Sequence, residues 1–265
     1  EATVRDLMYH EEHVKENERS RIRQKLARCG VELFCGEASF VDATTLRVVP
    51  TGAAPGAGGE EIRLRAGRIL IATGSSPTRP SEFPFDHPRV WDSDEILQLE
   101  RIPKSLAVVG AGVIGSEYAC TFAALGVKVH VLDGRKVLLP FLDKEISAAL
   151  AGAMEQQLGM TFHWEQRVRR CDAPVQGDGD IVLTLMSDEK VAVEAVLVAA
   201  GRHSNTGTLN LAAAGIAPGP KGLLAVDTEY RTSAKHIFAA GDVIGFPGLA
   251  ATSAEQARVA VAHAF

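Results

Sequence analysis

One stretch of the chain, residues 105–133, constrains the fold more than any other. The apolar run Ser105–Val109 leads directly into Gly-x-Gly-x-x-Gly at 110–115, and a helical stretch follows. A second apolar run, Val127–Leu132, ends on Asp133. Because the parts come in this order, the stretch predicts a strand, a phosphate-binding turn, a helix and a second strand of a Rossmann-like α/β fold.

Each glycine of this turn has a physical role. Gly110 allows the tight turn out of the strand, Gly112 lets the backbone approach a pyrophosphate, and Gly115 lets the helix pack close to the sheet. Phosphates at this turn would lie against unpaired amides at the helix N-terminus. Asp133, about twenty residues further on, can accept hydrogen bonds from an adenosine ribose. We therefore interpret the stretch as a dinucleotide site rather than an ordinary βαβ turn.

Composition narrows the class of protein. The 265 residues are 46% hydrophobic, which suffices for one large or two medium domains with a buried core. The net charge of −5 argues against a nucleic-acid partner, and no apolar run approaches the length of a membrane span. Four scattered cysteines fit a reducing compartment. We expect a cytoplasmic protein with no nucleic-acid or membrane partner.

Three other expected strands end at small residues or at an acid. They are Ile69–Gly74, Ala195–Gly201 and Ile237–Asp242. Open α/β sheets bind ligands at the carboxyl ends of their strands, so each strand can bring backbone or a carboxylate to a ligand. Asp242 precedes a helix expected from Leu249 onward, which suits a sugar hydroxyl beside a phosphate. Taken alone, an acid that caps a loop is the simpler interpretation of Asp242.

A charged helix and a small antiparallel sheet are expected before the glycine-rich turn. Residues 1–29 have apolar residues at roughly helical spacing, and Gly30 is the expected stop. β-rich runs follow, interrupted by a glycine-rich loop at 52–59: residues 31–40, 44–49 and 61–64. Cys29 and Cys35 have neither a redox nor a zinc spacing, so we expect buried structural thiols. The same interpretation holds for Cys120 and Cys171.

A second helix and further strands are expected after Asp133. The helix covers 143–158 and stops at Gly159. Its apolar residues lie on one buried face: Ile146, Leu150, Met154 and Leu158. Strands are expected at 161–168, 181–186 and 190–193, with a hairpin turn at 177–179.

Four motifs together resemble the pyridine nucleotide-disulfide oxidoreductases, flavoproteins with two dinucleotide folds. In chain order they are Ala72–Ser75, Gly110–Glu117, Gly201–Thr206 and Ala240–Val243. The resemblance covers nearly the whole chain. It implies an α/β fold in which a Rossmann-like NAD-binding domain of ββα three-layer character is inserted in a partial FAD-binding domain. The FAD part would comprise residues 1–102 and 221–265, and the NAD(P) part residues 103–220.

The resemblance also implies which residues contact the cofactors FAD, NAD(H) and NADP(H). The nicotinamide dinucleotide would contact Gly110, Ala111, Gly112, Val113, Ile114, Gly115, Glu117, Asp133, Arg135, Val168, Gly201 and Arg202. FAD would contact Thr73, Gly74, Ser75, Asp242, Leu249 and Ala250. Glu117 would point toward the nicotinamide and Val168 toward the adenine. No catalytic nucleophile and no metal ligand is expected.

Two segments, Leu138–Ile146 and Gly241–Ala250, are most similar to family members that transfer hydride between NADPH and NAD+ through FAD. Such an enzyme accepts both nucleotides at one site. Asp133 favours a free 2′-hydroxyl and repels a 2′-phosphate. Arg135 pairs with that phosphate if Asp133 swings away, or it is a solvated surface charge.

The chain departs from the family pattern at both ends. The family's own first Gly-x-Gly-x-x-Gly for FAD and its C-terminal interface domain, which would form a homodimer, are absent from these 265 residues. We therefore expect a fragment that is inactive by itself, binds nicotinamide dinucleotide, and holds FAD weakly or not at all. Two alternatives stay open. One is dihydrolipoamide dehydrogenase, which needs an upstream Cys-x-x-x-x-Cys, and the other is a nucleotide-binding module without redox chemistry.

Overall fold

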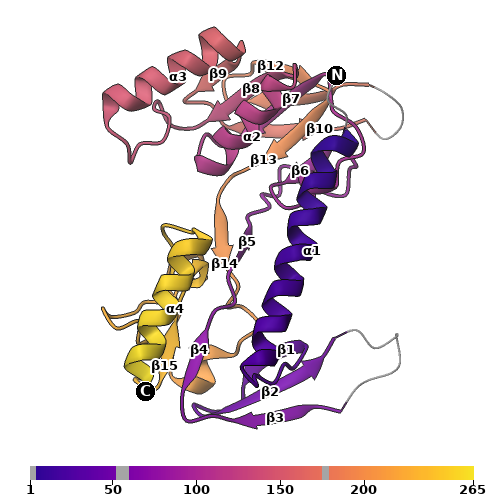
Figure 1. The fold of residues 1–265 in the computed structure, drawn as a ribbon. Coiled ribbons are helices and arrows are strands. Elements are labelled where there is room, and N and C mark those ends of the chain that lie inside the picture. Colours follow the sequence, from indigo (N-terminus) through magenta and orange to yellow (C-terminus); the bar gives the residue numbers. More distant parts are fainter. Residues whose placement is uncertain (1–3, 52–59, 175–178) are drawn as a thin grey trace. The chain divides into compact units, whose positions relative to one another are not determined.

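The computed structural model describes residues 4–51, 60–174 and 179–265 (Figure 1). The chain divides into two compact units. Unit 1 comprises Glu1–Arg19 and Pro77–Gly201, and unit 2 comprises Ser20–Ser76 and Arg202–Phe265. The domain boundaries predicted after residues 102 and 220 fall inside these units, and the assignment of each segment to a cofactor stays a prediction.

A long polar helix, α1 (Val4–Arg28), confirms the helix expected at the start of the chain. Its residues as far as Arg19 belong to unit 1 and the others to unit 2. Val14 and Ile22 are 48% and 54% exposed, whereas Val4 is partly buried against the core of unit 1. Among the described residues, no helix combines the length and the apolar character needed to span a membrane.

A five-stranded parallel sheet forms the centre of unit 1. Its order is β6 (Val90–Asp92), β13 (Ala195–Val198), β7 (Ser105–Val109), β8 (Lys128–Asp133) and β9 (Thr161–Trp164). α2 (Val113–Ala124) connects β7 to β8, and α3 (Lys144–Leu158) follows β8. This βαβ order confirms the Rossmann-like fold and places the glycine-rich turn at the carboxyl end of β7.

Both faces of the parallel sheet are covered (Figure 1). Leu106 and Val108 of β7 belong to a buried cluster with Phe122 of α2. Ala107 between them belongs to another cluster, with Leu183 of an antiparallel sheet. The strands of that sheet are β10 (Val168–Asp172), β11 (Ile181–Leu185) and β12 (Lys190–Val193). Because successive strand residues point to opposite faces, unit 1 has three layers, which confirms the expected ββα character.

Short strands build most of unit 2. The antiparallel sheet confirms the expected meander and consists of β1 (Gly36–Phe40), β2 (Thr45–Pro50) and β3 (Ile62–Arg65). Two further pairs are β4 (Ile69–Ile71) with β15 (Ile237–Ala239), and β5 (Ser75–Pro77) with β14 (Arg202–Ser204). The 3-10 helices of the described chain include η1 (Glu95–Gln98), η2 (Leu211–Ala214), η3 (Pro220–Gly222) and η4 (Asp242–Ile244).

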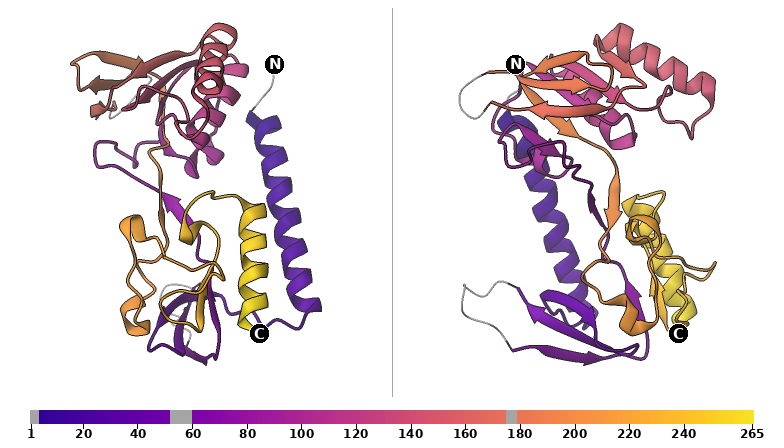
Figure 2. Two further views of the ribbon diagram at one scale, coloured as in Figure 1. Left: turned by 90° about the vertical axis from the view of Figure 1, so that its left-hand side faces the viewer. Right: turned by 180° about the vertical axis from the view of Figure 1, so that it is seen from behind.

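The expected C-terminal helix is confirmed as α4 (Ala250–Ala264). It packs beside β15, and the two are drawn in yellow tones in Figure 2. Ala260 of this helix is 1% exposed, and Gln256 accepts a hydrogen bond at its Oε1 from Gly241 N at 2.8 Å. The helix is therefore tied to the chain that leaves the tip of β15.

Some expected strands differ in extent. The strand expected at 161–168 is two strands, because Glu165 takes a left-handed φ of 58° between β9 and β10. The strand expected from 31 begins only at Gly36. The sequence does not predict β5, β6 or β14, since three residues are too few to show a period. The loop at 52–59 and most of the turn at 177–179 lie outside the described residues.

The expectation of buried thiols is wrong for Cys29 and Cys35, which are both exposed. Cys120 and Cys171 are partly buried, and all of these thiols are free. Burial raises the pKa of the Cys120 thiol, and it raises the pKa of Cys171 to about 11. These two thiols stay protonated at neutral pH, as expected of structural cysteines.

The buried face of α3 is the expected one except in its first turn, since Leu150 and Leu158 pack partly buried against the core of unit 1. Met154 is 1% exposed as predicted, but Ile146 is 59% exposed. Ser147 is buried in its place at 1% exposure and donates a hydrogen bond to the carbonyl oxygen of Leu138. The hydroxyl contact thus fixes the rotation of the first helical turn.

Two substitutions in α3 test this buried face. We expect Met154→Ala to lower the free energy of unfolding by about 2–5 kcal/mol, because it leaves a cavity in the core. We expect Ile146→Ala to change it by less than about 0.5 kcal/mol, because its side chain is largely exposed. Urea unfolding followed by circular dichroism measures both values. Similar losses for the two variants would contradict the buried face described for α3.

Candidate dinucleotide site

The glycine-rich turn has the close contacts that its sequence predicts. Gly110 takes a φ of 108°, and a Cβ there would lie 2.4 Å from the carbonyl oxygen of Ala199. A Cβ on Gly115 would lie 1.9 Å from the carbonyl oxygen of Gly110. Gly112, in contrast, has open space where its Cβ would be. Gly110 and Gly115 are therefore required by the fold, while Gly112 leaves the turn open toward a ligand.

The turn fits a pyrophosphate. Gly112 is the N-cap of α2, and among the described residues no side chain caps this helix. The first amides of α2 are then available to phosphate oxygens, and the helix dipole favours the negative charge. Val113 is 44% exposed and Glu117 is also exposed, while Ile114 is partly buried. Their contacts with a dinucleotide stay predictions.

Asp133 at the tip of β8 is held by four hydrogen bonds. Its Oδ2 accepts from Ala111 N at 2.7 Å and from Arg135 Nη2 at 2.6 Å. Its Oδ1 accepts from Arg135 N and from Arg135 Nε, each at 2.8 Å. These bonds fill the roughly four acceptor positions of a carboxylate. Asp133 therefore ties the glycine-rich turn to the tip of β8, a structural role that its spacing does not reveal.

The contacts between Asp133 and Arg135 favour the charged form of both side chains. Burial raises the pKa of Asp133, but the hydrogen bonds from Arg135 and Ala111 outweigh it and hold the pKa below its ordinary value. The hydrogen bond to Asp133 raises the pKa of Arg135. Asp133 is 7% exposed at its side chain and Arg135 46%. That Asp133 swings away from a 2′-phosphate stays a prediction, and Arg135 is the more exposed partner of the pair.

The expected adenosine end of the site is bounded by the tip of β8 and the segment that joins β9 to β10. Gln166 N donates to the carbonyl oxygen of Asp133, and Glu165 N donates to that of Arg135, each at 3.1 Å. Val168, the expected adenine contact, is the first residue of β10 and is partly buried against the core cluster that contains Leu183. Its contact with adenine stays a prediction.

The neighbouring strand reaches the same edge of the sheet. β13 pairs in parallel with β7, and Gly201 follows it with a φ of 102°. The carboxyl ends of parallel strands meet at one edge, so the structure brings Gly201 and the glycine-rich turn together. Arg202, expected among the nicotinamide contacts, belongs to unit 2 instead. Its Nε donates to Ser75 Oγ and its Nη2 to the carbonyl oxygen of Ser75, each at 2.8 Å.

The residues expected to contact FAD lie near the ends of short strands in unit 2. Ser75 Oγ donates to Asp242 Oδ2 at 2.8 Å, which joins the start of β5 to the segment that follows β15. Asn205 Nδ2 donates to the carbonyl oxygen of Thr73 at 3.0 Å. A Cβ on Gly241, which has a φ of 82°, would lie 3.2 Å from Ser253 Oγ of α4. This close approach brings Asp242 to the N-terminal turn of α4.

The N-terminus of α4 fits an anionic group beside Asp242. Leu249 is its N-cap and is 57% exposed, and within the described chain no side chain caps the helix. The amides of Ala250, Ala251 and Thr252 precede the first helical hydrogen bond, from Ser253 N to the carbonyl oxygen of Leu249, and are available to an anion as at α2. The residues present thus suit a phosphate and a sugar hydroxyl of FAD, while the contacts of Thr73, Gly74 and Ser75 with it stay predictions.

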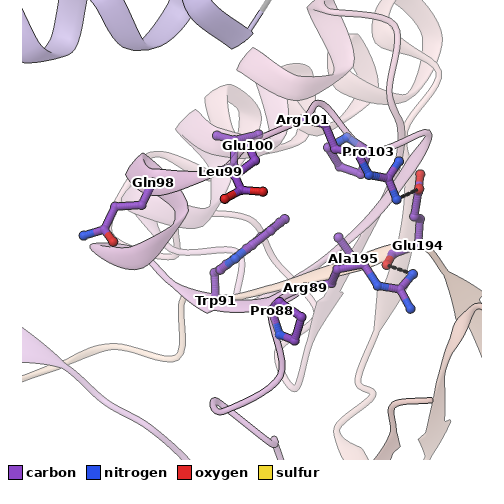
Figure 3. A pocket seen from close by; sticks show the side chains of 10 residues that line it. All are labelled: Pro88, Arg89, Trp91, Gln98, Leu99, Glu100, Arg101, Pro103, Glu194 and Ala195. Atoms are coloured by element: carbon purple, nitrogen blue, oxygen red, sulfur yellow. Dashed lines mark hydrogen bonds and ion pairs between the residues drawn. The ribbon is translucent and has the colours of Figure 1, made fainter. Parts of the chain in front are cut away.

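A separate cavity of about 340 Å³ lies in unit 1 at the amino ends of the parallel strands, away from the glycine-rich turn at their carboxyl ends (Figure 3). Trp91, Ala195 and Pro103 line it, at or just before the amino ends of β6, β13 and β7. Glu194 at its wall pairs with Arg101 and accepts from Lys104 N at 2.5 Å. The cavity is therefore not part of the site at the carboxyl ends.

The fold and its strand-tip sites define a protein with a Rossmann-like FAD/NAD-binding fold. Residues 1–264 match the family model described as pyridine nucleotide-disulphide oxidoreductase, and the chain belongs to this family. The resemblance drawn from the four motifs is thereby confirmed.

Curated relatives share close to half of the residues. The chain is 42% identical over 263 residues to a soluble pyridine nucleotide transhydrogenase of Mycobacterium tuberculosis, covering 99% of this chain and 54% of that protein. It is 45% identical over 239 residues to one of Pseudomonas aeruginosa, covering 89% and 49%. The chain thus spans about half the length of the curated relatives that it matches.

Solved structures have the same fold. LpdA from Mycobacterium tuberculosis superposes with a TM-score of 0.87 at 27% identity, covering 100% of this chain and 57% of that one. The HOCl-induced flavoprotein disulfide reductase RclA from Escherichia coli, in a Cu(II) complex, superposes with a TM-score of 0.85 at 28% identity, covering 97% and 56%. Both support the mixed α/β fold with its parallel sheet.

Proposed function

We propose that this chain is the nicotinamide-nucleotide part, with a portion of the FAD part, of an FAD-dependent oxidoreductase that transfers hydride between NADPH and NAD+. The names of the curated relatives support this reaction. The observation that carries the proposal is the tip of β8, where Arg135 neutralises Asp133 beside an open glycine-rich turn. A site with an unopposed acid would reject a 2′-phosphate, whereas this one can accept NAD(H) and NADP(H) in turn.

The residues of the chain bind and orient the nucleotide in this proposal. The amides at the start of α2 hold the pyrophosphate, and the tip of β8 holds the adenosine ribose. Ser75, Arg202 and Asp242 fix the strand ends on the FAD side through their hydrogen bonds. When bound, FAD supplies the hydride chemistry between the two nicotinamides. The protein supplies position and electrostatics rather than a nucleophile.

The reaction is tested on the complete gene product. We expect oxidation of NADPH with thio-NAD+ as acceptor, and no comparable oxidation of NADH with lipoamide. Rapid lipoamide reduction would instead assign the protein to the dihydrolipoamide dehydrogenases, an alternative that the fold of flavoprotein disulfide reductases keeps open. Binding of NADH without flavin or turnover would assign a non-catalytic nucleotide-binding module. The cytoplasmic location and the homodimer of the complete protein belong to the same proposal.

A further inference from the structure

The side chain of Arg167 lies against Gly134, next to Asp133. A Cβ on Gly134 would be 2.9 Å from Arg167 Nε and 3.3 Å from its Cγ. The backbone of Gly134 is not in the left-handed region, so its conformation does not require glycine. What the missing Cβ provides is room for the Arg167 side chain at the tip of β8.

The backbone around Arg167 is held in place. The carbonyl oxygen of Arg167 accepts from Met186 N at 2.9 Å, and the preceding Gln166 N donates to the carbonyl oxygen of Asp133. The arginine is therefore anchored both to β8 and to the end of β11. These hydrogen bonds place the backbone of Arg167 beside the tip of β8, within reach of Gly134.

Arg167 differs from the neighbouring arginine and lysine side chains in its ion-pair partners. The others have carboxylate partners: Arg135 with Asp133, Lys136 with Glu165, Arg169 with Asp188, and Arg170 with Asp172. Among the residues that the structure describes, no carboxylate pairs with the exposed guanidinium of Arg167. The tip of β8 thus carries a positive charge that no carboxylate in the described part of the chain neutralises.

We propose that Arg167, together with Arg135, binds the 2′-phosphate of NADP(H), and that Gly134 is the gap that lets Arg167 reach it. The inference rests on the proposed function, because it places the adenosine ribose at the tip of β8. Arg135 already fills the acceptor positions of Asp133, so the acid does not repel an added phosphate. A guanidinium suits this role, since its fork of donors matches phosphate oxygens. NAD(H) has a hydroxyl there and needs no such cation.

The test compares two ligands that differ only in the 2′-phosphate, adenosine 2′,5′-bisphosphate and AMP, bound to the complete protein. We expect Arg167→Ala to weaken binding of the bisphosphate by about tenfold or more and to leave AMP within about twofold, measured by calorimetry. Gly134→Ala should give a smaller loss in the same direction, because its Cβ displaces the guanidinium. Raising the salt concentration should reduce the wild-type preference for the bisphosphate.

The control is Arg169→Ala, which removes a nearby guanidinium that is paired with Asp188. It should leave both ligands unchanged, and melting temperatures should show that all variants fold. Equal losses for the two ligands in Arg167→Ala, or no loss for either, would overturn the inference. Wild-type protein that binds neither NADH nor NADPH would overturn the proposed function itself, which distinguishes the two failures.

Discussion

Gly115→Ala is expected to weaken binding of the nicotinamide dinucleotide and to destabilise the fold. The added Cβ would lie 1.9 Å from the carbonyl oxygen of Gly110 and 3.3 Å from the Cβ of Ala199. Neither neighbour is the end of a flexible side chain, so α2 must move away from β7. We expect the free energy of unfolding to fall by about 1–3 kcal/mol, the usual cost of overpacking. We also expect NADH affinity to fall by at least about tenfold, because the amides of α2 leave the pyrophosphate.

Gly152→Ala is the matched control for this substitution. Gly152 lies within α3, and its Cβ would meet no atom within 4 Å. There alanine should stabilise the protein by about 0.5–1 kcal/mol, because it favours the helical conformation. Fluorescence titration with NADH and thermal unfolding measure both variants. A Gly115→Ala protein with wild-type NADH affinity would show that α2 is not held at the turn as described.

The sequence can predict the turn because its determinants are local. A strand, three glycines, a helix and a strand follow one another within residues 105–133, and the βαβ connection places them without long-range information. The close contacts of Gly110 and Gly115 then follow from the fold. In the same way, the three short β-rich runs of the meander suffice to predict β1, β2 and β3.

Contacts between distant residues could not be predicted in this way. The spacing identifies Asp133 as an acid at a strand tip, but it does not show that Ala111 N and Arg135 occupy both of its oxygens. Arg167 reaches Gly134 only because the segment after β9 bonds back to β8. The one available signal is that Arg167 precedes Val168, the residue expected at the adenine. Likewise, an apolar period cannot reveal that a hydrogen bond from Ser147 turns Ile146 outward.

Asp133→Asn is expected to destabilise unit 1 and its dinucleotide turn. The amide keeps the shape of the side chain but replaces one acceptor oxygen by a donor, which must then face Ala111 N or Arg135. Leaving a buried donor without its acceptor lowers the free energy of unfolding by about 1–3 kcal/mol. Asp172→Asn is the control, because Asp172 pairs with Arg170 at an exposed site. That variant should lose less than about 1 kcal/mol.

The loss in the free energy of unfolding caused by Asp133→Asn should become smaller as the pH falls. The pKa of Asp133 is lower in the folded chain than the ordinary value of 3.8, so the native state binds its proton less tightly than the unfolded state does. The charged side chain therefore contributes its full stability above the ordinary pKa, and this contribution is lost as the pH falls through the folded pKa. Urea unfolding should show a constant difference between wild type and Asp133→Asn from about pH 5 to 8, and a shrinking one below about pH 4. A difference that stays constant at the lowest pH would contradict an ionised Asp133 as the tie between the glycine-rich turn and the tip of β8.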